Sequence, residues 1–282
     1  MTSERSLYPA GPGTVRAEWG PMRLVLEVWR KNRPDGDLAW SGGRIAFQAL
    51  EDIGAEYRRL QAPSLELKID PRSRVAAAML QATRALHEPD LTPMAAVAGS
   101  IADQVADWLA EQGAEKAIVD NGGDIAIRLS PTSSARVGLQ ALPRQPEVNH
   151  TLHLDGRQTS WGVATSGLGG RSLTKGIAST VTVLAQTAAA ADAAATAVAN
   201  ACTVDDVRIL RVPARSLDPA SDLDNDLVTM GLEPLERELW AQALEQGMAK
   251  AETYCMNGLL SWAGCIVGPL SAVTGKVLIV AE

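Results

Sequence analysis

The chain has 282 residues, which is long enough for one large domain or two average ones. Its composition, 46% hydrophobic and 21% charged residues, is that of a globular protein and excludes a disordered chain. Its 33 acidic and 26 basic residues give a formal net charge of −7, which argues against a duplex-binding protein, and no nucleic-acid partner is expected. The 3 cysteines form no C-x-x-C pair and are too few for a disulfide framework.

The sequence carries no signal for a membrane. Its first residues lack the apolar core of a secretory signal peptide, and no apolar run reaches the roughly eighteen residues of a membrane span. We therefore expect a cytoplasmic protein with no membrane partner. Helices rich in small residues and an apolar C-terminal region favour a homodimer.

Apolar periodicity predicts an N-terminal arm over residues 1–20, which are polar and rich in turn formers, and a single α+β domain over residues 21–282. In chain order the pattern predicts a strand at 23–29, a turn-rich hairpin or loop at 31–43, and helices at 45–60, 71–87 and 93–111. It then predicts a hairpin of strands 116–119 and 125–129, strands at 136–139, 151–154, 162–165 and 179–184, helices at 186–201 and 235–252, and a last strand at 277–280. Mixed or antiparallel sheets packed with helices are the expected architecture.

The hairpin turn is the first candidate for chemistry. Asn121, Gly122, Gly123 and Asp124 place two glycines beside acidic and amide side chains. Glycines adopt positive φ angles without strain, so backbone N–H and C=O groups of this turn are free to face a ligand or a metal. A plain type I′ hairpin explains the same residues, and that alternative stays open.

A glycine-rich loop after the strand at 162–165 is the second candidate. Thr165, Ser166 and Gly167 lead into further glycines and Arg171. Backbone amides of such a loop can hold phosphate oxygens, and a guanidinium adds a fork of donors to the same group. The loop does not match the P-loop or the dinucleotide-binding pattern, and a flexible connection with a solvated arginine is the alternative.

The third candidate is an alanine-rich helix in which Asp192 is the one acidic residue. Thr196 lies one turn later on the same face. A carboxylate and a hydroxyl at this spacing offer two hard oxygen ligands, which suits Mg²⁺ with water and phosphate completing the shell. Alternatively, Asp192 caps a break in the helix or faces solvent.

Together these segments resemble the ApbE-like superfamily of Mg²⁺-dependent flavin transferases. Four motifs of that family occur in its order, namely Asn-Gly-Gly-Asp at 121–124, Ala-Thr-Ser-Gly at 164–167, Ser-Thr-Val-Thr-Val at 179–183 and Ala-Asp-Ala-Ala-Ala-Thr at 191–196. The resemblance implies an α+β fold with T-fold-like halves merged in one domain. It also implies that FAD is the substrate and that its FMN half is passed to a Ser or Thr hydroxyl of an acceptor protein.

The resemblance also implies roles for single residues. Asp192 and Thr196 would be the metal ligands, and the turn at 121–124 would meet the dinucleotide or the metal through its backbone. Thr165, Ser166 and Gly167 would line the same pocket. A phosphate contact by Arg171 is inferred from its charge alone and is not supplied by the family.

One departure from the family separates two hypotheses. Typical members carry a His-x-x-Asp-Pro-x-Thr-Gly hairpin where this chain has only residues 168–178, which contain no His and no Asp. The catalytic residues therefore stay unassigned. The first hypothesis is a Mg²⁺-dependent enzyme that acts on flavin or another anionic small molecule, with FMN transfer as its leading form. The alternative is a non-catalytic flavin or small-ligand binding protein that helps a partner enzyme to mature.

Overall fold

The fold is built on a 10-stranded sheet in which every pair of neighbouring strands is antiparallel. The computed structural model describes residues 4–139, 150–170, 172–277 and 279–281. The strands of this sheet are β1 (Ser6–Gly11), β2 (Thr14–Trp19), β3 (Met22–Arg30), β4 (Arg33–Pro34), β5 (Lys116–Asn121), β6 (Ile125–Leu129), β9 (Ser160–Ser166), β10 (Thr180–Ala185), β13 (Trp262–Val267) and β14 (Leu270–Gly275). Their order is β1-β2-β3-β5-β6-β9-β10-β13-β14, with β4 paired to β3.

Two smaller sheets and a set of helices complete the molecule. The small sheets are β15-β8-β7, made of β7 (Ser134–Leu139), β8 (His150–Asp155) and β15 (Ile279–Ala281), and β11-β12, made of β11 (Ile209–Pro213) and β12 (Leu227–Leu232). The helices are α1 (Gly36–Glu56), α2 (Arg74–Ala85), α3 (Val97–Glu111), α4 (Ala188–Ala201), α5 (Ala214–Leu217) and α6 (Arg237–Met256), with 3-10 turns at Tyr57–Arg59 and Pro93–Ala96.

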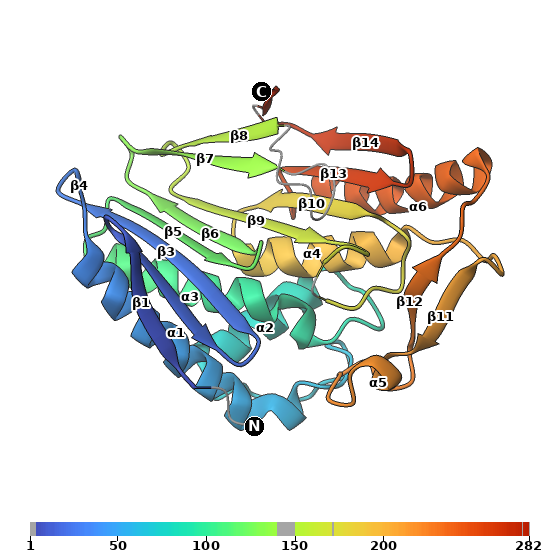
Figure 1. Cartoon of the computed structure of the whole chain (residues 1–282), viewed down its shortest axis with the longest axis horizontal. Helices are drawn as coiled ribbons and strands as arrows, with labels where there is room; N and C mark the ends of the chain where they lie inside the picture. The colour runs from blue at the N-terminus through green and yellow to red at the C-terminus, as the bar shows by residue number, and fades with distance from the viewer. Residues whose placement is uncertain (1–3, 140–149, 171, 278, 282) are drawn as a thin grey trace.

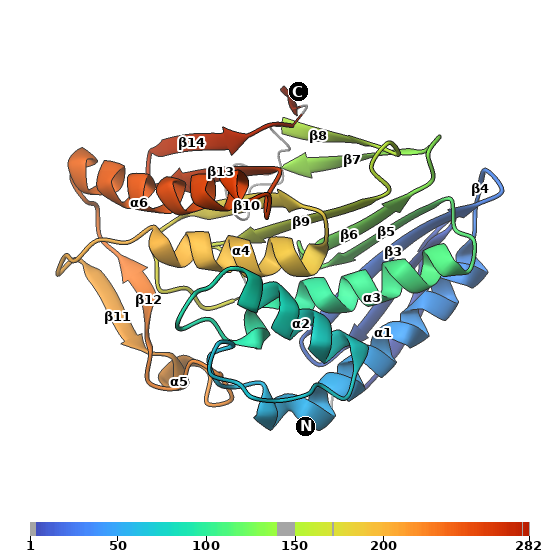
Figure 2. The ribbon, with the colours of Figure 1, turned by 180° about the vertical axis from the view of Figure 1, so that it is seen from behind.

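The two faces of the large sheet are covered differently (Figures 1 and 2). Helices α1, α3, α4 and α6 pack on one face, and α2 lies against α3 and α4 as an outer layer. The other face is partly covered by β7 and β8, where Ile127, Leu154 and Leu184 belong to a separate apolar cluster. Because β-strand side chains alternate between faces, this division decides which residues of a strand can reach the helices.

Helix α4 lies at the centre of the helical layer because its side chains are small. Thr187 caps its N-terminus by accepting a hydrogen bond from the Ala190 N–H at 3.2 Å. A Cβ placed on Gly162 of β9 would lie 2.0 Å from the Thr187 carbonyl carbon. The glycine therefore lets the strand backbone touch the start of the helix, a contact that no larger residue permits.

The predicted fold class is confirmed, since antiparallel sheets packed with helices form an α+β fold. The prediction of an arm over residues 1–20 is wrong for β1 and β2, which extend the edge of the large sheet. Only Val15 and Ala17 are buried in these strands, so the apolar alternation is too short to reveal them. Gly13, with φ +68°, lies in the turn that joins the two strands.

The turn-rich reading of residues 31–43 is wrong from Gly36 onward, where α1 begins. Asp35 caps this helix by accepting a hydrogen bond from the Leu38 N–H at 2.9 Å. Gly42 does not make a turn; a Cβ on it would lie 3.0 Å from Leu26 Cδ2. This glycine therefore serves close packing of α1 on the sheet.

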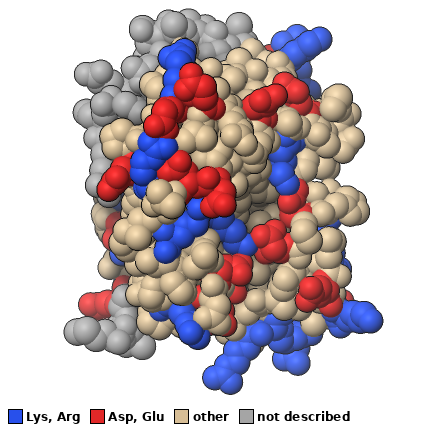
Figure 3. Space-filling model, turned by 90° about the vertical axis from the view of Figure 1, so that its right-hand side faces the viewer, with Lys and Arg blue, Asp and Glu red and all other residues tan. Residues whose placement is uncertain are grey.

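Within the described residues, no helix is both long and apolar enough to cross a bilayer. Figure 3 shows the side of the molecule that carries β11 and β12, where acidic and basic side chains are interspersed. No single-sign surface of the kind expected for a nucleic-acid interface stands out on this side.

Candidate functional site

Helices α3 and α4 touch backbone to backbone near their N-termini. Gly99 lies in the first turn of α3, and a Cβ added to it would lie 2.2 Å from the carbonyl oxygen of Ala188 in the first turn of α4. We call this contact the α3–α4 crossing. It brings the N–H groups at the starts of two helices, which have no partner within their own helix and favour negative charge, close to each other.

Asp192 lies at this crossing, on α4, with its side chain partly buried. Its Oδ2 accepts a hydrogen bond from the Gly99 N–H at 2.9 Å, and the Ala98 N–H also donates to the carboxyl group. Loss of hydration raises the pKa of Asp192 to about 7, although these two N–H donors act in the opposite direction and Asp103 adds to the increase. The aspartate therefore neither caps a break in its own helix nor points freely into solvent.

The predicted hairpin turn reaches the same crossing through Asn121. Its Nδ2 donates to the carbonyl oxygen of Ala98 at 3.2 Å, and its side chain is 6% exposed. The structure thus brings Asn121 and Asp192 onto neighbouring backbone groups of α3, although 71 positions separate them in the sequence.

The remaining turn residues form the hairpin that the sequence predicts. Gly122 and Gly123 have φ angles of 73° and 109°, which only glycine adopts easily. The Gly123 N–H donates to Asp120 Oδ1 at 2.7 Å, and the Asp124 carbonyl accepts from the Asn121 N–H at 3.0 Å. The Gly123 amide is therefore used inside the turn, and Asn121 is the member of the motif that contacts the crossing.

Thr196 and Asn200 continue the face of α4 that begins with Asp192. All three side chains are partly buried, whereas most of their neighbours on the helix are fully buried. Asn200 Oδ1 accepts hydrogen bonds from the Lys175 N–H at 2.9 Å and the Thr174 hydroxyl at 3.2 Å. Asn200 was not predicted, but its spacing of four residues from Thr196 was a signal for it.

The glycine-rich loop is only partly associated with this face. Thr165 points to the opposite face of the sheet from Ala164, which packs in the same cluster as the alanines of α4. Its hydroxyl pairs with that of Thr182 at 2.9 Å. The structure therefore does not bring the Thr165 side chain to Asp192, whereas Ser166, one position further, alternates back to the α4 side.

Gly167 joins β9 to the loop with φ +135°, and a Cβ on it would lie 2.6 Å from the Ser179 carbonyl oxygen. It is a close-packing glycine in the described structure. Arg171, the predicted phosphate contact, lies outside the described residues.

The residues at the crossing fit Mg²⁺ only with ligands from elsewhere. Among the described residues, no group of three or more His, Cys, Asp or Glu side chains is arranged to hold a metal ion. Asp192 offers the carboxylate, and two of its lone-pair positions are used by the N–H groups of Ala98 and Gly99. Mg²⁺ often binds through one or two carboxylates with water and substrate phosphates completing its shell, so the donor set fits the ion together with a phosphorylated ligand.

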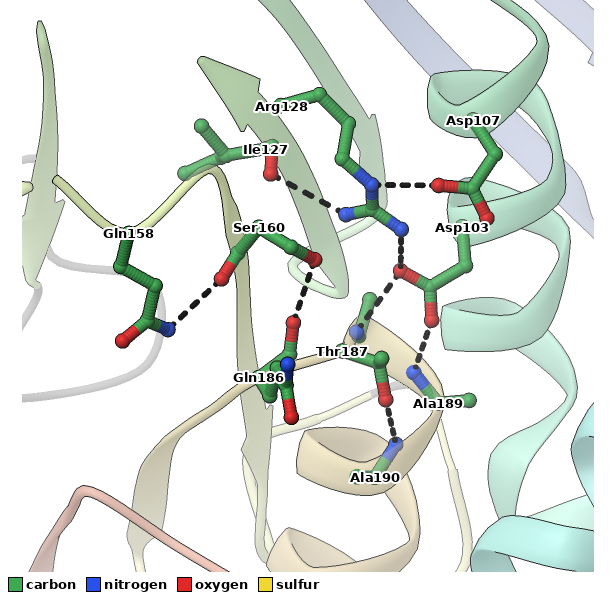
Figure 4. A network of polar contacts seen from close by, with 11 residues as sticks. Asp103, Asp107, Ile127, Arg128, Gln158, Ser160, Gln186, Thr187, Ala189 and Ala190 are labelled. Atoms are coloured by element: carbon green, nitrogen blue, oxygen red, sulfur yellow. Dashed lines mark hydrogen bonds and ion pairs between the residues drawn. The ribbon is translucent and has the colours of Figure 1, made fainter. Parts of the chain in front are cut away.

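A buried ion pair lies on the other side of the crossing (Figure 4). Asp103 of α3 accepts hydrogen bonds from the N–H groups of Ala188 and Ala189 at 3.0 and 2.8 Å. Arg128 of β6 donates to Asp103 at 2.9 Å and to Asp107 at 2.6 Å. Burial raises the pKa of Asp103 above its ordinary value, although Arg128 and the α4 N–H groups oppose the increase. No motif in the sequence predicted this ion pair.

A cavity of about 390 Å³ opens beside this ion pair. Its lining includes Asp103, Arg128 and Gln186 together with alanines of α2. The ion pair is therefore close to solvent on one side, while Asp103 and Arg128 themselves are only 6% and 8% exposed.

Comparison with known proteins gives three findings. The model of the family described as AbpE bacteria matches residues 5–277. A UPF0280 protein from Methanothrix thermoacetophila is 38% identical over 141 residues, which are 50% of this chain and 57% of that protein. A UPF0280 protein from Methanopyrus kandleri is 39% identical over 153 residues, 52% of this chain and 57% of that protein. The matches thus span little more than half the length of these relatives.

Among solved structures, the flavin transferase ApbE from Vibrio cholerae superimposes with a TM-score of 0.50. The superposition covers 97% of both chains at 14% sequence identity. At that identity the likeness concerns the fold, and it agrees with the antiparallel sheet and helical layer described above.

Proposed function

Since the chain belongs to the bacterial AbpE family, we propose that it is a Mg²⁺-dependent enzyme that handles flavin, with FMN transfer from FAD to a partner protein as its reaction. The resemblance drawn from the four sequence motifs is confirmed by the family match and by the fold it shares with an ApbE flavin transferase. Mg²⁺, FAD and the acceptor protein belong to the proposal.

The observation that carries the proposal is the environment of the Asp192 carboxyl group. Its carboxyl group loses hydration at the crossing, has no basic side chain of the described residues among its contacts, and has a pKa of about 7. A cation bound there would favour the ionised form, since a nearby positive charge lowers the pKa of an acid. The carboxylate is thus suited to a cation that the side chains of the described residues do not supply.

The proposed reaction is a phosphoryl transfer. The acceptor hydroxyl oxygen forms a bond to the FMN phosphorus of FAD, the phosphoanhydride P–O bond breaks, and AMP leaves with the electron pair while the hydroxyl proton is released. Mg²⁺ held by Asp192 and Thr196 would neutralise charge on the diphosphate. Asn121 and Asn200 would flank the dinucleotide and hold the surrounding backbone in place.

The test is titration of the purified protein with FAD, with and without Mg²⁺, followed by mass analysis for AMP. We expect FAD binding that depends on Mg²⁺, release of AMP, and loss of both in Asp192→Asn. Asp52→Asn is the control, because this aspartate lies on α1, away from the crossing, and accepts a hydrogen bond from the side chain of Gln48. Failure of FAD to bind, or binding without Mg²⁺, contradicts the proposal.

A second candidate is a flavin-binding protein without transferase activity that assists a partner. It is favoured by one observation, the absence of His and Asp from residues 168–178, where related enzymes carry both. This candidate predicts FAD binding without AMP release, and binding that survives Asp192→Ala.

A further inference from the structure

The starts of α3 and α4 are capped by carboxylates from each other. Asp192 of α4 accepts hydrogen bonds from the first turn of α3, through Gly99 at 2.9 Å. Asp103 of α3 accepts hydrogen bonds from the first turn of α4, through Ala188 and Ala189 at 3.0 and 2.8 Å. Each carboxylate therefore satisfies N–H groups that have no partner within their own helix.

The two caps depend on one another because the helices have no freedom to slide. Gly99 touches the Ala188 carbonyl on one side of α4, and Gly162 touches Thr187 on another. A shift of α4 by one residue would move it about 1.5 Å along its axis. Such a shift separates Asp103 from its two donors and, at the same time, moves Asp192 away from Gly99.

Arg128 holds the Asp103 side of this arrangement in place. It donates to Asp103 at 2.9 Å and to Asp107 at 2.6 Å. In the described structure no hydrogen bond joins Asp107 to α4, and its side chain is 57% exposed, against 9% for Asp103. The two aspartates thus share one arginine, but only Asp103 connects it to α4.

We propose that Asp103 is a positioning residue that sets the location of Asp192 at the N-terminus of α3. It acts through α4: Asp103 fixes the first turn of that helix, and the helix carries Asp192 and Thr196 to the backbone of Ala98 and Gly99. The functional consequence rests on the proposed role of Asp192 as a metal ligand. The positional part does not, because it concerns hydrogen bonds within the protein.

The experiment compares Asp103→Asn with Asp107→Asn, since each removes one negative charge and one partner of Arg128. The first measurement is amide hydrogen exchange at Gly99 in the metal-free protein, which reports the Asp192 cap directly. The second is Mg²⁺ affinity in the presence of excess FAD, measured by competition with Mn²⁺, on protein shown to be folded by circular dichroism.

For Asp103→Asn we expect exchange at Gly99 to accelerate about tenfold or more, since charge-assisted hydrogen bonds of this kind are strong. We expect Mg²⁺ affinity to fall about 10- to 100-fold, the loss typical when a partner that orients a metal ligand is removed. In Asp107→Asn both quantities should stay within about twofold of the original protein, because the Asp107 carboxylate is largely exposed and accepts no hydrogen bond from α4 in the described structure. A role of Asp103 in general stability alone would leave Mg²⁺ affinity unchanged in the folded protein.

Unchanged protection of Gly99 in folded Asp103→Asn overturns the proposal, and so do equal effects of the two variants. If Asp103→Asn does not fold, Asp103→Glu takes its place. It keeps the charge and the Arg128 pair but lengthens the side chain, and accelerated exchange at Gly99 is again expected. If the unaltered protein binds no Mg²⁺ in the presence of FAD, the proposed function fails, while exchange at Gly99 still decides whether Asp103 positions Asp192.

Discussion

An arginine lies between two carboxylates both beside the α3–α4 crossing and beside the β11–β12 ribbon, yet the two groups have different structural roles. At the crossing, Arg128 and Asp103 are almost fully buried and connect β6, α3 and α4. Beside the ribbon, Arg208 pairs with Asp206 at 2.8 Å and with Glu236, whose side chain is 60% exposed.

Exposure to solvent explains why these two ion-pair groups have different structural roles. Water reaches the Arg208 group, in which the Arg208, Asp206 and Glu236 side chains are 28%, 17% and 60% exposed, so its charges are screened more than those of the Arg128–Asp103 pair. Arg128 and Asp103 have given up their hydration, so each of these two charges depends on the partners that the protein supplies. The Arg128–Asp103 pair therefore fixes the relative position of β6, α3 and α4, whereas the Arg208 group joins residues at the surface of the molecule.

The largest effect is expected from Arg128→Met. The change leaves Asp103 buried without its cation, and removing one partner of a buried pair costs about 3–5 kcal/mol. We expect about 3 kcal/mol, because the N–H groups of Ala188 and Ala189 still donate to Asp103. Urea denaturation measures the free energy of unfolding, and a loss below about 1 kcal/mol would place this pair with the exposed ones.

The next effect is expected from Gly99→Ala, which tests the backbone contact without changing a charge. The added Cβ would lie 2.2 Å from the Ala188 carbonyl oxygen, so the helices must move apart at a cost of about 1–3 kcal/mol or more. Gly54→Ala is the matched control: it lies within α1 with nothing within 4 Å of the new Cβ. There alanine should stabilise the helix by about 0.5–1 kcal/mol. Thermal unfolding of both variants tests the contrast, and equal changes in the same direction contradict it.

A third prediction concerns the dependence of stability on pH, to which Asp192 and Asp206 contribute with opposite signs. The pKa of Asp192 is about 7 in the folded protein against an ordinary 3.8. Between these values the folded state keeps a proton that the unfolded chain has released, so this group lowers stability as pH rises from about 4 to about 7. The pKa of Asp206 is held at about 2 by hydrogen bonds from Arg208, so its contribution is present above about pH 4 and is lost as pH falls toward 2.

Thermal unfolding between pH 4 and 7 in the presence of EDTA measures the Asp192 contribution. Asp192→Asn should make the dependence on pH across this range shallower, with the part due to Asp103, whose pKa is also raised, remaining; Asp206→Asn should leave the dependence as it is. An unchanged slope in Asp192→Asn would assign the titration to another group.

Much of the fold can be predicted from patterns within short stretches of sequence, but the α3–α4 crossing cannot. The hairpin at 121–124 was predicted because Asn-Gly-Gly dictates its own turn, and α4 was predicted because ten of its residues are alanine. In each case the residues that make up the signal lie within a few positions of one another in the sequence. The edge strands β1 and β2 were missed because an edge strand buries few side chains, and short alternation is a weak signal.

The site depends on contacts between distant segments. Asp192 was singled out because an acid among alanines is locally unfavourable, but its partner Gly99 is 93 positions away. Asp103 and Arg128 looked like ordinary polar positions of an amphipathic helix and an alternating strand. Only the packing of α3 against β6 and α4 turns them into a buried pair, and no periodicity in the sequence encodes that packing.

The smallest effect is expected from Arg208→Met, the counterpart of Arg128→Met. Both changes remove an arginine that is shared by two carboxylates and replace it with an uncharged, shorter side chain. Asp206 and Glu236 regain water when Arg208 is removed, so the loss of unfolding free energy at neutral pH should be small and well below that of Arg128→Met. This small loss should be present above about pH 4 and should vanish as pH falls toward 2, because the hydrogen bonds from Arg208 that hold the pKa of Asp206 at about 2 stabilise the ionised carboxylate. A loss at neutral pH comparable to that of Arg128→Met would mean that hydration does not separate the two groups, and the comparison would fail.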